Sequence, residues 1–235
     1  MQLVRALSTL GLLVAFSGLA HAGISSTITL TNDYDFRGVS QSAEDPALQA
    51  SFDYADDNSG WYAGAWASNV DFGDSTDIEL DLYTGFTGMT DAGLGWDAGF
   101  VYYIYDEDQH NFPEIYTGFT YSYFNAKLSF TNDYGGNDSP GHATALYLSG
   151  GAELPLPVKD LTINGHIGRT IGNHRFDDYV LGGDYTDFSV GVGYKVQHFD
   201  LGLKLVTTDA SPKTKSDVFN NETRFVFTVS TQLPW

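Results

Sequence analysis

The most regular feature of the sequence is an alternation of apolar and polar residues with a period of two. In the segment DIELDLYTGF, Ile78, Leu80 and Leu82 share one parity. Glu79 and Asp81 share the other. Successive side chains of a strand point to opposite faces, so this pattern predicts β-strands with one apolar and one polar face.

Twelve segments carry this alternation, and no segment after the signal-like first 22 residues shows the period of an amphipathic helix. The chain is therefore predicted to be all-β. The segments span residues 25–37, 46–56, 61–72, 77–88, 94–105, 112–121, 124–134, 143–154, 159–171, 185–197, 198–208 and 223–235.

The connections between these segments alternate in length. Odd-numbered connections are long and acidic, such as DEDQHN at 106–111, whereas even-numbered ones are short, such as TDAG at 90–93. Outer-membrane barrels have short periplasmic turns and long external loops, and each of their strands needs about 9–11 residues. The pattern therefore predicts a transmembrane antiparallel up-and-down β-barrel of about 12 strands.

The two ends of the chain predict export. Residues 1–22 contain Arg5, an apolar run over 10–19 and the small-x-small sequence Ala20-His21-Ala22, which is typical of a cleaved secretory signal peptide. Residues 23–235 are then a single outer-membrane barrel domain.

The last predicted strand, ETRFVFTVSTQLPW, alternates apolar residues and ends on the aromatic Trp235. It resembles the C-terminal signal that outer-membrane proteins present to the barrel-assembly machinery. We therefore expect passage through the periplasm to the outer membrane of a Gram-negative bacterium, with membrane lipid and lipopolysaccharide around the barrel.

Composition excludes several classes of protein. The chain has no cysteine, which excludes disulfides and thiolate metal sites, and its net charge of -19 disfavours a nucleic-acid partner. It is rich in aromatic residues, with 15 Tyr, 16 Phe and 4 Trp. In a membrane barrel such residues form belts at the two interfaces with water. The residues expected in these belts are Tyr34, Trp61, Trp96, Tyr105, Tyr121 and Trp235.

In a membrane barrel the polar residues of each strand face the lumen, and here many of those residues are charged. Acids fall on the second to sixth predicted strands and bases on the seventh to twelfth, with Glu153 as an exception. Arg37, placed on the first strand near the outer mouth, joins the basic side and could pair with Asp33, Asp35 or acids of the adjoining strand. The predicted pore-lining residues are Arg37, Asp53, Glu79, Asp81, Asp97, Glu114, Lys127, His166, Lys195, Lys204 and Arg224.

Such a lumen has two interpretations. Opposed charges across a narrow channel would orient small polar solutes or ions that diffuse through it. Alternatively, the charges pair with one another and fill a closed lumen, as in small barrels, which leaves a structural or adhesion-type barrel with acidic external loops.

The sequence evidence for a catalytic or metal site is weaker than the evidence for a barrel. A rim hydrolase would need a serine, a histidine and an acid in contact, and the candidates are Ser139 with His142, and His174 with Asp177. Neither pair lies in a GxSxG sequence. The acidic run 106–108 lacks the spacing of a calcium loop and is typical of a solvated loop. No catalytic residue, metal or cofactor is predicted.

Residues 25–55 (SSTITLTNDYDFRGVSQSAEDPALQASFDYA), followed by WYAGAWASNVDF and DIELDLYTGF, resemble the TorF family of porin-like proteobacterial proteins, also designated Gcw_chp. The segment DYDFRGVSQ at 33–41 is the most distinctive part of the match. The resemblance implies an outer-membrane barrel with passive transport, and it implies no catalytic residue and no particular substrate.

Overall fold

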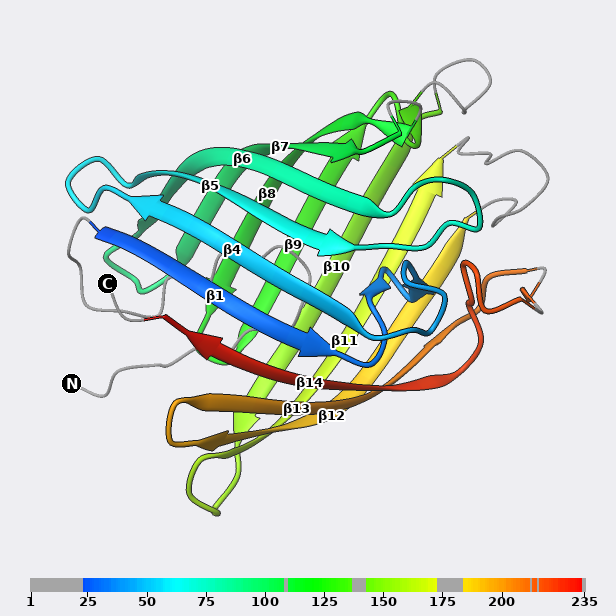
Figure 1. Cartoon of the computed structure of the whole chain (residues 1–235). Helices are drawn as coiled ribbons and strands as arrows, with labels where there is room; N and C mark the ends of the chain where they lie inside the picture. Colours follow the sequence, from blue (N-terminus) through cyan, green and yellow to red (C-terminus); the bar gives the residue numbers. More distant parts are fainter. Residues whose placement is uncertain are drawn as a thin grey trace.

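The computed structural model describes residues 23–107, 110–136, 143–172, 184–211, 213–214 and 216–233. Within these residues, twelve strands form one closed antiparallel barrel, in which each strand pairs with its neighbour in sequence and β1 pairs with β14 (Figure 1). The predicted all-β, up-and-down barrel is confirmed. The predicted signal peptide lies outside the described residues.

The barrel strands agree with the predicted segments to within three residues at each end, except that the first ends six residues early. They are β1 (Gly23–Thr31), β4 (Ala47–Ala55), β5 (Trp61–Asn69), β6 (Ile78–Met89), β7 (Gly95–Tyr105), β8 (Phe112–Tyr121), β9 (Phe124–Thr131), β10 (Ala145–Pro155), β11 (Leu161–Gly172), β12 (Tyr185–Val196), β13 (Phe199–Thr208) and β14 (Arg224–Gln232). Two further strands, β2 (Asp35–Phe36) and β3 (Val39–Ser40), pair only with each other.

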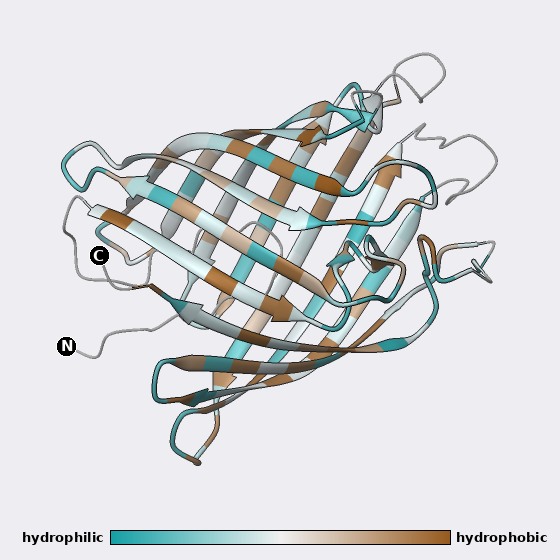
Figure 2. Cartoon of the chain, viewed as in Figure 1, coloured by the Kyte–Doolittle hydropathy of each residue, from teal (hydrophilic) through white to brown (hydrophobic). Residues whose placement is uncertain are grey.

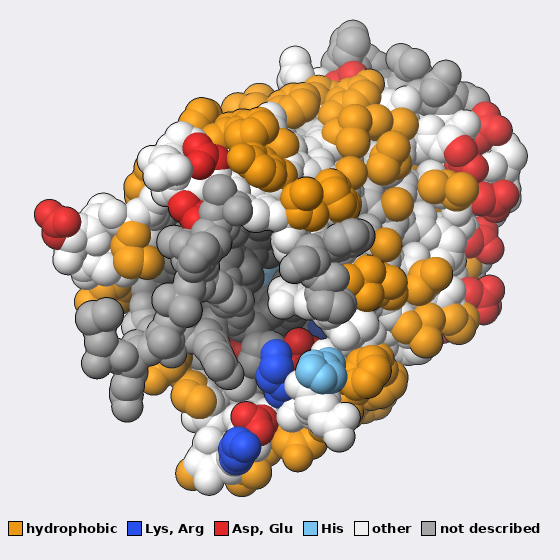
Figure 3. Space-filling view, turned by 60° about the vertical axis from the view of Figure 1, so that its left-hand side comes forward, with side chains coloured by type: hydrophobic (Ala, Val, Ile, Leu, Met, Phe, Trp, Pro, Cys, Tyr) orange, Lys and Arg blue, Asp and Glu red, His pale blue; other side chains and the backbone are white. Residues whose placement is uncertain are grey.

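The outside of the barrel is apolar. On β6, Ile78 is 53% exposed while its neighbour Glu79 is 1% exposed, because the alternation directs apolar side chains outward and polar ones inward. Apolar and polar bands alternate along the strands in Figure 2, and apolar side chains cover the outer surface in Figure 3. An apolar surface of this extent is unfavourable in water and is stabilised by lipid, so the barrel has the surface of a membrane-spanning protein. Among the described residues, no helix is long and apolar enough to cross a membrane.

The predicted aromatic belt is partly wrong. Trp61, Trp96 and Tyr121 are exposed on the outer surface, but Tyr34 and Tyr105 are each only 7% exposed. Tyr105 has the parity of the buried Tyr103 and therefore points inward, and Tyr34 lies beyond the end of β1. Trp235 lies outside the described residues.

The first strand ends at Thr31, six residues before the predicted end at Arg37. Asn32 then binds the edge of β14 with its side chain: Nδ2 donates to the carbonyl of Phe225 at 3.2 Å, and Oδ1 accepts from the amide of Phe227 at 2.5 Å. The chain leaves the barrel wall after this contact. Residues 33–42, which we call the lumen hairpin, fold into the barrel at the end that carries the long connections (Figure 1).

Candidate functional site: the lumen and its hairpin

The lumen hairpin is built on a two-residue turn. Phe36 pairs with Val39, and the two residues between them, Arg37 and Gly38, have φ of 50° and 84°. Positive φ at both central positions is the geometry of a type I′ turn, whose twist matches that of paired strands. A Cβ added to Gly38 would lie 2.8 Å from Cβ of Asp187, so the turn packs directly on β12.

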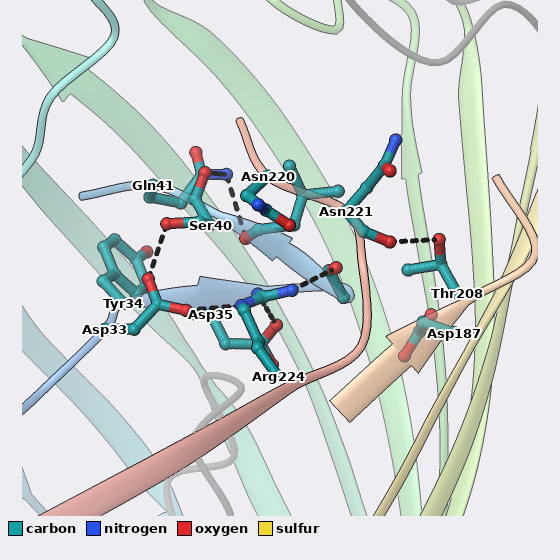
Figure 4. Close-up of polar contacts among 12 residues, drawn as sticks. Asp33, Tyr34, Asp35, Ser40, Gln41, Asp187, Thr208, Asn220, Asn221 and Arg224 are labelled. Atoms are coloured by element: carbon teal, nitrogen blue, oxygen red, sulfur yellow. Dashed lines mark hydrogen bonds and ion pairs between the residues drawn. The ribbon is translucent and has the colours of Figure 1, made fainter. Parts of the chain in front are cut away.

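One arginine of the barrel wall holds the base of the hairpin (Figure 4). Arg224 on β14 donates from Nε to Asp33, from Nη2 to Asp35 at 2.5 Å, and from Nη1 to the carbonyl of Gly38 at 2.9 Å. Lys204 on β13 lies 2.9 Å from the other oxygen of Asp35. Burial alone would raise the pKa of the Asp35 carboxyl, but Lys204 and Arg224 outweigh it and hold the pKa below its ordinary value.

The tip of the hairpin reaches the opposite wall. Arg37 donates from Nη2 to Glu114 on β8, and the two side chains are 6% and 1% exposed. Around the barrel, β8 lies five strands from β1 in one direction and seven in the other. The guanidinium carbon also lies 4.3 Å from the ring centroid of Tyr147 on β10 and 4.7 Å from that of Phe36. Burial acts to lower the pKa of Arg37, but Glu114 more than compensates and the pKa is raised.

Aromatic packing fills the space beside these ion pairs. The ring of Tyr34 lies 5.3 Å from that of Trp66 on β5, and the ring of Phe36 lies 6.0 Å from that of Tyr103 on β7. On the other side, Val39 belongs to a buried cluster with Tyr185. The hairpin therefore contacts both sides of the lumen at the long-loop end.

Ten of the eleven predicted lining residues lie on barrel strands. The exception is Arg37, which is not on the first strand and does not pair with Asp33, Asp35 or an adjoining strand; its partner is Glu114. Whether these residues line a conducting path stays a prediction. Of the predicted residues, Arg37 forms an ion pair with Glu114. Lys204 and Arg224 come together because each binds one oxygen of Asp35.

The remaining acids of the predicted set bind tyrosines or lie side by side. Asp53 accepts from the hydroxyl of Tyr83, and Asp97 accepts from the hydroxyl of Tyr62 at 3.1 Å. Glu79 and Asp81 are neighbours on the inner face of β6, and both are buried. Lys127 places Nζ 4.2 Å from the ring centroid of Tyr116. The acidic side of the lumen is thus lined with phenols as well as carboxylates.

Sequence reasoning assigned His166 on β11 to the lumen but missed its partners, Tyr147 on β10 and Asp187 on β12. His166 Nε2 lies 2.9 Å from Asp187 Oδ1 and 2.9 Å from the hydroxyl of Tyr147, which also donates to Asp187 at 3.2 Å. The alternation along β12 could have predicted the position of Asp187, because it precedes the outward-facing Phe188 and therefore points inward. Asp187 interrupts the predicted basic side of the lumen.

The lumen has a hollow toward the end with the short turns. It is a cavity of about 70 Å³ that opens to solvent, and Figure 3 shows this end of the barrel hollowed. Most of its side chains are polar or charged: Glu153, Thr162, Asn164, Asp200, Lys204, Thr228 and Ser230. Near it, Lys195 Nζ lies 3.2 Å from Asp200 Oδ1.

The candidate residues for a rim hydrolase and for a calcium loop lie only partly within the described residues. Ser139, His142, His174 and Asp177 lie outside the described residues, as does Asp108 of the acidic run. In the part of the chain that the structure describes, no group of three or more His, Asp or Glu side chains could hold a metal ion.

Comparison with known proteins gives a matching sequence family and several solved structures with a similar fold. A family model described as "Bacterial protein of unknown function (Gcw_chp)" matches residues 17–233. No curated protein matches the sequence. The structure of the NanC porin is 8% identical with a TM-score of 0.57, and the match covers 89% of this chain and 100% of that one.

Two further solved structures are similar. One, from work on the in-meso crystallization of membrane proteins, is 12% identical with a TM-score of 0.53, and the match covers 89% of this chain and 83% of that one. LpxR from Salmonella typhimurium is 9% identical with a TM-score of 0.46 over 88% of this chain and 99% of that one, a value too low to support an argument. At these identities the likeness shows the fold alone.

Proposed function

The chain belongs to the Gcw_chp family, and from this membership and the geometry of the lumen we propose that it is a porin-like channel. It lies in the outer membrane of a Gram-negative bacterium and passes small polar solutes or ions by passive diffusion. The finer designation as a TorF-type porin, insertion by the barrel-assembly machinery, and contact with lipopolysaccharide are parts of the same proposal.

The observation that carries this proposal is the contrast between the two faces of the barrel. The outer face is apolar, whereas the hollow at the short-turn end is lined by groups such as Lys204, Asp200 and Asn164. Charged and amide groups are costly to bury away from water, and a hydrated path removes that cost. An arrangement of this kind favours polar, water-soluble cargo over lipid.

A second candidate function is a closed barrel with a structural or adhesive role. It is favoured by the packing of the other end, where Glu79 and Glu114 are fully buried and the lumen hairpin contacts both sides. The two candidates differ in one measurable property, which is whether solutes cross a membrane that contains the protein. Neither requires a catalytic residue.

Liposome swelling separates the two candidates. Purified full-length mature protein in liposomes is diluted into isotonic arabinose, raffinose or potassium chloride, and light scattering reports entry. The channel predicts swelling that is faster for the smaller solutes than for the larger ones. Protein-containing liposomes that swell no faster than empty ones, even with the hairpin-releasing substitutions described below, would overturn the proposal in favour of the closed barrel.

A further inference from the structure

We propose that the lumen hairpin is a displaceable plug, and that the ion pair between Arg37 and Glu114 holds it in the closed position. This inference rests on the proposed channel function, because a plug has a purpose only where something can pass. It assigns a role to the segment 33–42, which the sequence places in a barrel strand and an external loop.

The hairpin is complementary in charge to both sides of the lumen. Its acids, Asp33 and Asp35, bind Arg224 and Lys204 on the basic side. Its single arginine crosses to Glu114 on the acidic side. Each charge of the hairpin therefore neutralises a wall charge of opposite sign, which fixes its docked position and cancels the wall charges that would otherwise attract solutes.

The two ends of the hairpin are held unequally. The base is continuous with β1, is fixed to β14 through Asn32, and receives donors from Arg224 at Asp33 and Asp35. A backbone bond from Ser40 to Asn220, at 2.8 Å, adds to this end. The turn at the tip accepts one bond from Arg224, at the carbonyl of Gly38, and it reaches Glu114 on the far wall through Arg37. Loss of the pair between Arg37 and Glu114 thus removes the hairpin's ion pair with the far wall, while its connection to β1 remains.

The ion pairs of the closed position are compatible with reversible release. Charges that separate on release regain hydration, which offsets much of the lost attraction, whereas an apolar plug would expose its surface to water without compensation.

Thiol labelling measures the movement directly, because the chain has no cysteine of its own. Val39 belongs to the hairpin and is buried against Tyr185 in the docked position, so Val39→Cys provides a single reporter. The full-length mature protein in liposomes is treated with a membrane-impermeant maleimide. The labelling rate is compared in the reporter alone, with Arg37→Glu, and with Arg37→Glu combined with Glu114→Arg. Ser75→Cys, on an exposed loop, is the matched control reporter.

We expect Arg37→Glu to speed labelling of the Val39→Cys thiol about tenfold or more, because it sets two carboxylates in contact at a buried site. The reversed pair should restore the slow rate, and the Ser75→Cys rate should stay unchanged throughout. If Arg37→Glu fails to fold, Glu114→Gln, which removes only the acceptor charge, carries the same expectation.

An unchanged Val39→Cys rate in Arg37→Glu would overturn the proposal. So would a fast rate that the reversed pair does not restore, since the ion pair would then not be what holds the hairpin. Labelling reports movement and liposome swelling reports solute passage, so failure of the plug and failure of the channel are distinguishable.

Discussion

Arg37 and Glu114 form an ion pair across the lumen, between a hairpin that follows β1 and a strand five positions away around the barrel. Both side chains are almost completely buried. A buried pair of this kind adds little net stability compared with apolar packing, but breaking it on one side is costly. It therefore specifies one position of the hairpin, and substitutions of either partner should act on that position first.

A disulfide that fixes the hairpin to the neighbouring loop should keep the channel closed. The amide of Ser40 donates to the carbonyl of Asn220 at 2.8 Å, which brings the two backbones close enough for a disulfide between Ser40→Cys and Asn220→Cys. In the Arg37→Glu background, we expect liposome swelling to be slow in the oxidised protein and to rise on addition of a reductant.

The control for this experiment is a disulfide away from the hairpin. Thr207 and Thr223 have hydroxyl oxygens 2.8 Å apart and are suited to the same substitution. Swelling with the Thr207→Cys and Thr223→Cys pair should not respond to the reductant. Equal responses of the two disulfides would contradict a plug that moves.

Gly38→Ala should destabilise the closed hairpin. Its φ of 84° is unfavourable for a residue with a Cβ, by about 1–2 kcal/mol, and the added Cβ would lie 2.8 Å from that of Asp187. Gly93, with φ of 80° and open space around it, provides a matched control that carries the backbone strain without the contact. We expect faster labelling of Val39→Cys in Gly38→Ala than in Gly93→Ala; identical rates would argue against the packing of the turn on β12.

The stability of the protein should depend on Asp35 at neutral pH and not in acid. The folded pKa of Asp35 is lowered from its model-compound value of 3.8, so its ion pairs stabilise the fold above that pH and lose their effect as the pH falls through the lower folded pKa. Asp35→Asn should therefore reduce the free energy of unfolding in urea by about 3 kcal/mol at pH 7.

The same comparison in acid provides the check. At a pH below the lowered folded pKa, where the wild-type carboxyl is protonated as well, the difference in unfolding free energy between wild type and Asp35→Asn should nearly vanish. A difference of the same size at both pH values would mean that packing, and not charge, accounts for the effect.

Lys195 should influence ion preference at the short-turn end of the barrel. Its side chain is 41% exposed and lies beside Asp200, so Lys195→Glu would place two acids together near the hollow. We expect the reversal potential in a salt gradient to shift toward cation preference. Lys159→Glu, at a side chain 92% exposed on a short turn, is the control and should shift it less. Lys204 is unsuited to this test because it binds Asp35.

The strands could be predicted from the sequence because each one obeys a local rule. A strand such as β6 alternates Ile78, Leu80 and Leu82 with Glu79 and Asp81, and the lipid outside and the polar lumen require this alternation all along the strand. The strict alternation of short and long connections then leaves an up-and-down barrel as the favoured fold.

The lumen hairpin escaped prediction because its own alternation continues that of β1. Thr31, Asp33, Asp35 and Arg37 have the same parity, so nothing in the period marks the point where the chain leaves the wall. The sequence Arg37-Gly38 is also a weaker turn signal than Asn-Gly or Asp-Gly. Gly38 offered a clue, but it is equally suited to the end of a strand.

The pairing of charges across the lumen could not be derived from local patterns either. Separating acids from bases along the strands was possible, since parity gives the inner face. Joining Arg37 to Glu114 requires the barrel to be closed and the hairpin to be folded inside it, and both are tertiary properties. The segment most distinctive in the resemblance, 33–41, is the same segment that forms the hairpin.

The most direct test of this account is the single-channel conductance of the protein in planar lipid bilayers. Wild type, Arg37→Glu, and Arg37→Glu combined with Glu114→Arg are recorded under identical salt and voltage. The account predicts resolvable current steps that are larger or longer-lived in Arg37→Glu than in wild type, and a return to wild-type behaviour in the reversed pair. The absence of current steps from all three proteins would contradict it.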